Sequence, residues 1–170
     1  MNVILKNRIG IVSENNLKSQ LIQKGFGTLS NKDLALDLFE LYYLFETKKV
    51  KVIDLKKKQI SEKNLKEYIN KKIKEFEDKY LVYKSFRDKG YIIKDGAIFG
   101  FDFRVYEAQT TKTNEHTHTK YVVDVKRSHK ETVNEIIKSE RLANSIHTTY
   151  ILAIVDQENR IIKIKIERMI

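Results

Sequence analysis

The spacing of apolar residues changes at Gly90, and this change limits the possible folds more than any other feature of the chain. Between Ser61 and Gly90 apolar residues recur every three or four positions, at Leu65, Ile69, Ile73, Phe76, Tyr80 and Tyr83. This period predicts one amphipathic helix, with Gly90 placed to end it. After Gly90 apolar and polar residues alternate, as in strands with one buried face. The chain is therefore predicted to mix helices and strands.

The N-terminal part carries shorter signals of both kinds. Residues 3–12 alternate weakly and predict a strand or hairpin. Ser30 and Asp33 resemble a capping box, and the apolar stripe that follows predicts a helix; its members are Leu34, Leu38, Leu41, Tyr42 and Phe45. Residues 50–53 predict a strand. We therefore expect a small mixed N-terminal domain over residues 1–80.

The C-terminal part predicts strands around one helix. The Asp95-Gly96 pair predicts a tight hairpin turn, because such turns need positive φ angles. Residues 109–119 carry no large apolar side chain and predict a loop. The other elements are expected in the order β-β-β-α-β-β, at 91–94, 98–106, 121–125, 131–146, 150–155 and 161–166. This order predicts an α/β (α+β) domain over residues 81–170 with a mixed central sheet.

The charge of the chain favours a polyanionic partner. It has 33 Lys and Arg against 23 Asp and Glu, a net charge of +10. Basic side chains that neutralise phosphates release counterions, so nucleic acid is the first candidate. The excess is +6 over residues 1–80 and +4 over residues 81–170. The net charges of the two parts of the chain therefore do not show which part binds the ligand.

Composition also excludes several classes of site. The chain has no cysteine, which excludes disulfides, thiolate nucleophiles and cysteine metal sites. With only four histidines, we expect no metal and no cofactor. No run approaches the ~18 apolar residues of a membrane span, and the apolar stretch after Met1 is too short for a signal peptide. We expect a cytoplasmic protein with no membrane partner.

Two sets of residues in the C-terminal domain could cleave nucleic acid. The first is Asp102 with Asp124 and Lys126. Metal-dependent nucleases hold Mg²⁺ with two carboxylates and position a water with a lysine. Aspartate and lysine at strand ends are also common as plain solvated groups. A Mg²⁺-dependent nuclease is therefore one hypothesis.

The second set is Tyr106 and His118, on either side of the polar loop. The two approach one another if the loop returns beside its own start. Such a pair could take a proton from a ribose 2′-hydroxyl and give one to the departing 5′-oxygen, with a nearby cation to stabilise the phosphorane. This chemistry needs no metal. An exposed tyrosine and a loop histidine without a catalytic role are the alternative.

A longer stretch of sequence favours the second set. The segments lie at 80–96, 99–107, 118–123, 141–146 and 150–156. They read Tyr-Leu-Val-Tyr-Lys-Ser-Phe-Arg-Asp-Lys-Gly-Tyr-Ile-Ile-Lys-Asp-Gly, Phe-Gly-Phe-Asp-Phe-Arg-Val-Tyr-Glu, His-Thr-Lys-Tyr-Val-Val, Arg-Leu-Ala-Asn-Ser-Ile and Tyr-Ile-Leu-Ala-Ile-Val-Asp. In this order they closely resemble the archaeal tRNA-splicing endonucleases. The likeness covers residues 80–170. Residues 29–52 resemble the N-terminal domain of the same family more loosely.

The resemblance implies a nuclease-type C-terminal domain that cleaves precursor tRNA at a bulge-helix-bulge fold and leaves a 2′,3′-cyclic phosphate and a 5′-hydroxyl. The family uses a tyrosine base, a histidine acid and a lysine that stabilises the transition state. Tyr106 matches the tyrosine. His118 matches the histidine, although His116 is close enough to take its place. Arg141 matches an arginine that contacts a bulge nucleotide, a role suited to a stacking guanidinium.

The family lysine is missing. Where the family has Ser-Val-Arg-Lys, this chain has Ser-Ile-His-Thr, so Thr148 replaces the lysine. Either His147, Lys120 or Lys126 substitutes for it, or the chain is the structural subunit of a heteromeric enzyme and a paralogous chain supplies the complete triad. The second hypothesis is preferred, because some archaeal members combine a catalytic and a structural subunit. The retained tyrosine, histidine and Arg141 favour the first.

The resemblance also implies assembly. Family members pair tail to tail through the last strand, here residues 161–166, and form tetramers by inserting an acidic loop into a basic cleft. Asp156 and Glu158 occupy that loop position, although an ordinary polar hairpin turn is the alternative. We therefore expect a homo- or heterotetramer with a paralogous endonuclease subunit, acting on precursor tRNA. A nonspecific RNA-binding module is a further alternative.

Overall fold

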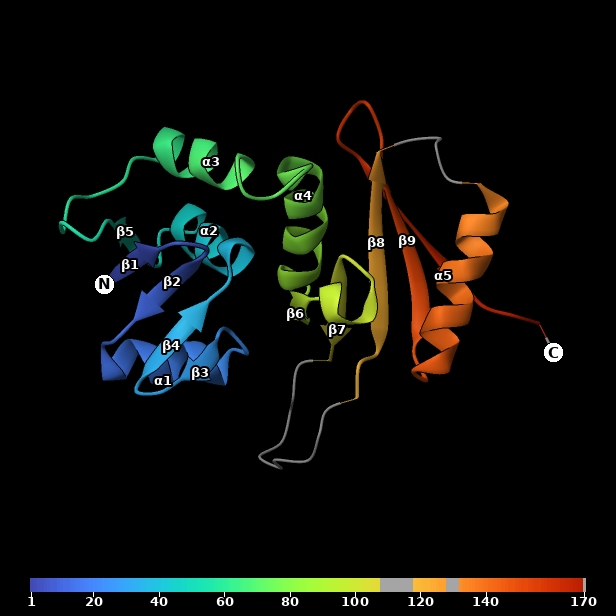
Figure 1. The fold of residues 1–170 in the computed structure, drawn as a ribbon, viewed down its shortest axis with the longest axis horizontal. Coiled ribbons are helices and arrows are strands. Elements are labelled where there is room, and N and C mark those ends of the chain that lie inside the picture. Colours follow the sequence, from blue (N-terminus) through green and yellow to red (C-terminus); the bar gives the residue numbers. More distant parts are fainter. Residues whose placement is uncertain (108–117, 128–131, 170) are drawn as a thin grey trace. The chain divides into compact units, whose positions relative to one another are not determined.

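The chain forms two compact units, which are described separately. The structure is a computed structural model, and it describes residues 1–107, 118–127 and 132–169. The first unit is Met1–Phe76 and the second is Glu77–Ile170 (Figure 1). The predicted division into two domains, residues 1–80 and 81–170, stays a prediction, because it concerns parts of the chain that fold independently. None of the described helices is both long and apolar enough to cross a membrane.

The N-terminal unit is a five-stranded mixed sheet with three helices. Its strands are β1 (Asn2–Lys6), β2 (Ile9–Val12), β3 (Thr28–Ser30), β4 (Asp33–Leu36) and β5 (Lys51–Ile53), in the order β3-β4-β2-β1-β5. Strands β1 and β5 are parallel, and the other neighbours are antiparallel. The helices are α1 (Asn15–Gln23), α2 (Leu38–Glu46) and α3 (Glu62–Asn70). The hairpin predicted over residues 3–12 is present as β1 and β2.

The predicted start of the helix at Ser30 is wrong. Ser30 and Asp33 pair with each other in a β3–β4 hairpin, because Asn31 takes the left-handed conformation (φ 56°) that reverses the chain. The true cap of α2 is Asp37, whose carboxylate accepts a hydrogen bond from the Glu40 backbone at 2.8 Å. The Glu40 carboxylate accepts one from the Asp37 backbone at 3.0 Å. The capping box therefore lies one strand later in the chain.

The single long helix predicted from Ser61 to Gly90 is also wrong. Ser61 does cap α3, but the chain leaves the helix at Asn70 and a second helix, α4, spans Phe76–Arg87. Glu75 has a φ of 57° at the join. The apolar period continues through the break because Ile69 and Phe76 are both buried. A turn without glycine or proline leaves no mark on such a period.

The C-terminal unit is a second five-stranded mixed sheet, as predicted. Its strands are β6 (Ile92–Asp95), β7 (Phe103–Tyr106), β8 (Tyr121–Arg127), β9 (Thr149–Val155) and β10 (Ile161–Ile166), in the order β10-β9-β8-β7-β6. Only β8 and β9 are parallel. Helix α5 (Val133–Ser145) makes the crossover between them. Figure 1 shows α4 and α5 on opposite sides of this sheet.

The Asp95-Gly96 pair does not form the predicted tight hairpin. Gly96 has a φ of −101°, a short 3₁₀ helix spans Ala97–Phe99, and the left-handed residue is Gly100 (φ 81°). The Asp95 carboxylate accepts a hydrogen bond from the Ala97 backbone at 2.7 Å, which starts this turn. Glycine is required at position 96 because a Cβ there would lie 2.8 Å from the Phe103 backbone. Strand β7 consequently begins at Phe103 rather than Ile98.

A half-buried carboxylate joins three elements of the C-terminal unit. Asp124 of β8 accepts hydrogen bonds on Oδ2 from the Tyr150 hydroxyl of β9 at 3.1 Å and from the Ser139 hydroxyl of α5 at 3.3 Å. Its Oδ1 accepts a weaker bond from the Asp102 backbone at 3.4 Å. Burial, followed by the nearby Asp102 charge, raises the pKa of Asp124. Folding therefore makes this carboxyl group bind its proton more tightly than it does in the unfolded chain.

Asp102 connects the same sheet to α4. Its Oδ2 accepts a hydrogen bond from the Val125 backbone at 2.8 Å. Its Oδ1 lies 2.7 Å from the ammonium of Lys79 in α4. The two aspartates thus link the sheet to the helices on both of its faces.

We predict that Asp124→Asn changes the pH dependence of stability. Because the pKa of Asp124 is raised in the folded protein, the folded state binds more protons than the unfolded state once the pH exceeds the ordinary pKa of an aspartate. This group therefore weakens the fold as pH rises through its folded pKa. The neutral asparagine should gain unfolding free energy relative to wild type as the pH rises from about 4 toward about 7, by about 1.4 kcal/mol for each pH unit that separates the folded pKa from the unfolded one. Urea unfolding across this range measures the difference.

The matched control is Asp124→Ala, which loses the bonds to Tyr150 and Ser139 and should be less stable than the asparagine variant at every pH. A constant free-energy difference between wild type and Asp124→Asn across the pH range would contradict the raised pKa.

Candidate active site at one end of the C-terminal sheet

One end of the C-terminal sheet gathers residues from three strands. Strand β7 is antiparallel to β8, and β8 is parallel to β9. The carboxyl end of β7 therefore meets the amino ends of β8 and β9. In this register Val105 lies opposite Tyr121, which lies opposite Thr149. Tyr106, the last residue of β7, thus lies at the same sheet end as the residues that precede β8 and β9.

Hydrogen bonds continue the sheet beyond the strands at this end. The Lys120 backbone N–H donates to the Val105 carbonyl at 2.8 Å. The Thr148 hydroxyl donates to the Thr119 carbonyl at 3.0 Å. Thr148, which the sequence predicts to stand at the position of the family lysine, therefore holds the chain at the residue after His118. It contributes position here rather than charge.

The structure brings the predicted acid and base to the same sheet end. Tyr106 is half-buried, and His118 is exposed. Residues 108–117, which include His116, lie outside the described residues. The assignment of the acid to His118 therefore stays a prediction.

A cation beside Tyr106 was missed by the sequence analysis. The guanidinium carbon of Arg104 lies 6.0 Å from the centroid of the Tyr106 ring and 5.3 Å from that of Phe99. The Arg104 Nε donates to the Asp95 carbonyl at 2.9 Å, which fixes the side chain. The available signal was the spacing of two within β7, since residues i and i+2 of a strand share a face. Arg104 is placed to favour a developing negative charge near Tyr106.

The three cations proposed as substitutes for the lysine have different surroundings. Lys120 pairs with Glu107 and lies over the rings of Tyr91 and Tyr121 at 5.9 and 5.4 Å. The hydrogen bond to Glu107 raises the pKa of Lys120, so its charge is retained but already paired. His147 is exposed directly after α5, with a φ of 55°. Lys126 lies about 16 Å along β8 from Tyr121, toward the other end of the strand.

The residues of the Mg²⁺ hypothesis are only partly available for a metal. Asp102 and Asp124 do lie together, but their oxygens accept the hydrogen bonds and the Lys79 ion pair described above. Within residues 1–107, 118–127 and 132–169, no three His, Cys, Asp or Glu side chains are grouped as a metal site requires. The hydrogen bonds and the ion pair of Asp102 and Asp124 are therefore typical of residues that stabilise the fold.

Arg141 lies on the exposed surface of α5. The preceding residue, Glu140, is buried and accepts a hydrogen bond from the Arg168 Nε at 2.7 Å. This bond attaches the C-terminal tail to α5. Arg141 itself therefore belongs to the solvent face of the helix, where its guanidinium is accessible to a large ligand.

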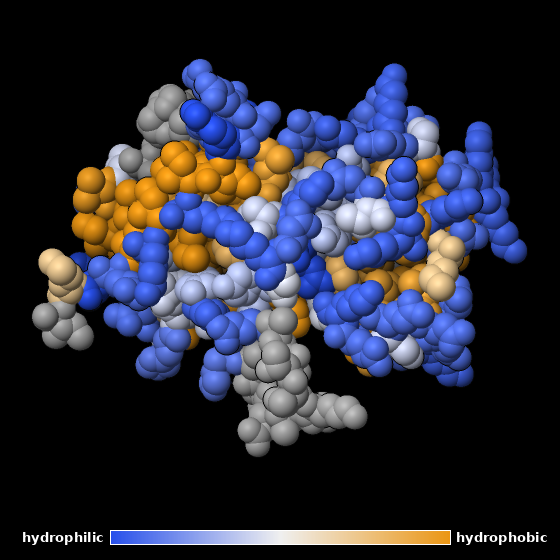
Figure 2. All heavy atoms as spheres, turned by 180° about the vertical axis from the view of Figure 1, so that it is seen from behind, coloured by the Kyte–Doolittle hydropathy of each residue, from blue (hydrophilic) through white to orange (hydrophobic). Residues whose placement is uncertain are grey.

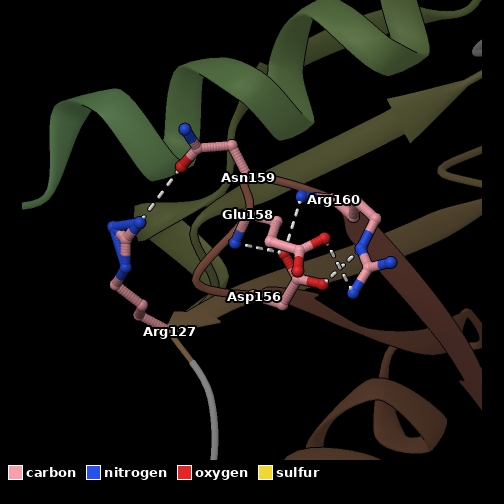
Figure 3. Close-up of polar contacts among 5 residues, drawn as sticks. All are labelled: Arg127, Asp156, Glu158, Asn159 and Arg160. Carbon is pink, nitrogen blue, oxygen red and sulfur yellow. Dashed lines mark hydrogen bonds and ion pairs between the residues drawn. The ribbon is translucent and has the colours of Figure 1, made fainter.

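The predicted acidic loop between β9 and β10 contains its own cation. Asp156 Oδ1 accepts hydrogen bonds from the backbones of Glu158 and Arg160, both at 2.8 Å. The Arg160 guanidinium lies 2.7 Å from Asp156 and 3.2 Å from Glu158 (Figure 3). The hydrogen bonds from Arg160 lower the pKa of Asp156. A basic partner would therefore compete with Arg160 for both carboxylates.

Arg127 attaches this loop to the rest of the unit. Its guanidinium donates to the Asp78 carboxylate of α4 at 3.0 Å and to the Asn159 side chain at 3.1 Å. Figure 3 shows Arg127 reaching the loop from the end of β8. The loop is therefore held by a contact from outside its own turn.

Comparison with known proteins identifies the family. The family model of the tRNA intron endonuclease catalytic C-terminal domain matches residues 76–163, and that of the N-terminal domain matches residues 1–66. The tRNA-splicing endonuclease of Pyrococcus furiosus is 36% identical over 146 residues, which cover 86% of this chain and 82% of the relative. That of Pyrococcus abyssi is 32% identical over 162 residues, covering 95% and 91%. The resemblance seen in the sequence is thereby confirmed, and the chain belongs to the tRNA intron endonuclease family.

Proposed function

We propose that this chain is a subunit of an endonuclease that cleaves precursor tRNA at bulge-helix-bulge intron junctions. The observation that carries the proposal is the register of β7, β8 and β9, which gathers Tyr106 and the segment starting at His118 at one sheet end. The printed name of the relatives, tRNA-splicing endonuclease, supports the substrate. The exposed Arg141 supports contact with an unpaired nucleotide.

The proposed reaction is an internal transesterification. In the subunit with the complete triad, the tyrosine acts as a phenolate and takes the proton of a ribose 2′-hydroxyl, and the 2′-oxygen attacks the adjacent phosphorus. Tyr106 is the residue of this chain that matches this tyrosine. The bond from phosphorus to the 5′-oxygen breaks, and the histidine of that subunit, which His118 matches in this chain, gives its proton to that oxygen. The products are a 2′,3′-cyclic phosphate and a 5′-hydroxyl. The step consumes no water and requires no metal.

The subunit role follows from Thr148. An electrostatic stabiliser of the transition state is worth on the order of 10²-fold in rate, and the Thr148 hydroxyl supplies no charge. We therefore assign the structural role to this chain and the complete triad to a paralogous partner. The hydrogen bond from Thr148 to Thr119 supports this assignment, because it gives the threonine a positional role of its own.

The proposed contact between subunits is β10. This strand is at the edge of the sheet, so one row of its backbone groups is available to another chain. Ile162 and Ile164 are 53% and 41% exposed, whereas Lys163 turns to the other face and lies 3.9 Å from the Phe86 ring centroid. Figure 2 shows a broad hydrophobic area on the C-terminal unit. Pairing through β10 would cover such a surface.

The first prediction concerns products and metal. We expect a mixture of this chain with a paralogous chain that carries tyrosine, histidine and lysine to cleave precursor tRNA fully in EDTA. End-group analysis should find a 2′,3′-cyclic phosphate. Cleavage that is lost in EDTA and restored by Mg²⁺ would instead support the set of Asp102, Asp124 and Lys126. If no mixture cleaves precursor tRNA, the result would instead support the hypothesis of a nonspecific RNA-binding module.

The second prediction concerns position 148. Purified alone, wild-type protein should cleave very slowly, and Thr148→Lys should raise the rate by roughly 10²-fold because it restores the missing charge. Thr148→Val is the matched control, since it loses the hydrogen bond to Thr119 without adding charge, and it should give no gain. Tyr106→Phe in the lysine background should remove the gain. Single-turnover kinetics measure all four proteins.

Fast cleavage by wild-type protein alone, lost on Tyr106→Phe, would overturn the structural role. Arg104→Gln would then test whether the neighbouring guanidinium replaces the lysine.

The third prediction concerns assembly. Ile162→Lys with Ile164→Lys should convert the protein to a monomer, because two charges would face each other across the proposed contact. Ile22→Lys with Ile98→Lys changes two isoleucines that are 43% and 80% exposed elsewhere, and this control should keep the wild-type state. Sedimentation velocity and circular dichroism measure association and folding. A well-folded β10 variant that still associates would exclude pairing through this strand.

A further inference from the structure

The positive charge of the chain is concentrated in one segment of the N-terminal unit. Residues 48–74, the basic segment, hold eleven lysines against three acidic residues, a net charge of +8 in 27 residues. The whole chain has a net charge of +10. All of these lysines except Lys66 are exposed. Nothing in the chemistry proposed for the C-terminal sheet uses this charge.

A rigid turn presents three of these lysines together. The Asp54 backbone N–H donates to the Lys58 carbonyl at 2.9 Å, and that of Lys57 to the Asp54 carbonyl at 3.0 Å. The Asp54 carboxylate accepts the backbone N–H groups of Lys56 and Lys58 at 2.8 and 2.9 Å. The nearest acid therefore holds the backbone of the turn. The mutual repulsion of Lys56, Lys57 and Lys58 is unfavourable in the free protein and is relieved by a polyanion.

A groove with an aromatic wall lies beside this turn. Its lining combines apolar, aromatic and basic side chains with one amide and one carboxylate, namely Leu5, Lys6, Asn7, Asp54, Leu55, Lys56, Ile60 and Tyr68. Tyr68 of α3 is half-buried, and its hydroxyl donates to the Asn7 carbonyl, which fixes the ring. Leu55 is 69% exposed. The Lys72 ammonium lies 5.7 Å from the Tyr68 ring centroid.

We propose that the basic segment and this groove form a second RNA-binding surface, separate from the candidate active site. Lysines that follow the phosphate backbone, together with a ring on which a base can stack, are the features that bind single-stranded nucleic acid. The identity of the RNA as the precursor substrate rests on the proposed function. The surface would hold an unpaired stretch of that RNA.

The structure favours RNA over a lipid surface as the partner. A helix that lies on a membrane exposes its apolar face to the lipid. In α3 the apolar residues Leu65 and Ile69 are fully buried in the unit. The helix of the basic segment therefore does not present the apolar face that a lipid surface needs, whereas Lys56 lines the groove.

Charge removal tests the electrostatic part. The full chain with Lys56→Gln, Lys57→Gln and Lys58→Gln should bind precursor tRNA roughly tenfold or more weakly at low salt. The slope of log affinity against log salt should become shallower by about 2, because two to three phosphate contacts are lost. The matched control, Lys24→Gln with Lys32→Gln and Lys89→Gln, removes the same charge from exposed sites outside the segment. It should change the affinity and the slope much less.

Two variants of Tyr68 test the groove. Tyr68→Leu removes the stacking ring and should weaken binding by roughly fivefold or more. Tyr68→Phe loses the hydrogen bond to Asn7 but keeps the ring, so it should bind RNA as wild type does. Fluorescence anisotropy measures affinity, and circular dichroism measures folding. Equal losses in both variants would mean a structural role only and would overturn the groove as a base-stacking site.

The remaining outcomes separate this proposal from the proposed function. Wild-type RNA affinity in the triple Gln variant, or an equal loss in its control, would overturn the second surface even if precursor cleavage is normal. Loss of binding in that variant but not in its control, in a protein that cleaves no precursor in any mixture, would support the surface and reject the proposed function. Binding to phosphatidylserine vesicles lost in the variant with RNA affinity unchanged would overturn the proposal in favour of a membrane.

Discussion

The parallel pairing of β8 with β9 is the constraint on which the C-terminal unit depends. It sets Tyr121 opposite Thr149 and so decides which residues precede both strands at one sheet end. A slip of one residue would turn every side chain of a strand to the other face. The Tyr150 hydroxyl bond to Asp124 crosses this pair. The hydrogen bond between Tyr150 and the partly buried Asp124 therefore also favours the register of β8 and β9 that the candidate active site requires.

The C-terminal strands and α5 were predictable because each has an apolar pattern of its own, which alternates in β7 and is nearly continuous in β9. The start of α2 was not, since Ser30 with Asp33 and Asp37 with Glu40 carry the same kind of capping signal, and only the left-handed Asn31 and the β3–β4 pairing distinguish them. The break before Glu75 was missed because the buried stripe continues across it. In these places the tertiary environment selected one of two locally acceptable structures.

The candidate site divides along a similar line. The resemblance to a known family selected Tyr106 and His118, and the strand register then brought their segments to one end. The position of Arg104 beside the Tyr106 ring depends on a hydrogen bond to the Asp95 carbonyl in a turn that the sequence predicted incorrectly. The bond between Thr148 and Thr119 joins residues 29 positions apart. The spacing of two within β7 places Arg104 and Tyr106 on one face, but neither of these two hydrogen bonds has a local sequence signal.

The residue at position 148 affects both the geometry and the charge of the candidate active site. One side chain at this position can donate a hydrogen bond to the Thr119 carbonyl in its present geometry or carry an ammonium to the phosphate, and threonine does the first. In the proposed function, the C-terminal unit therefore keeps Tyr106 and His118 at one sheet end but has no cation at position 148. The N-terminal unit holds a net +8 within 27 residues, enough to attract RNA regardless of the cation missing at position 148. In the proposed function, binding and bond cleavage then place separate demands on the chain, and threonine at position 148 impairs cleavage without removing binding.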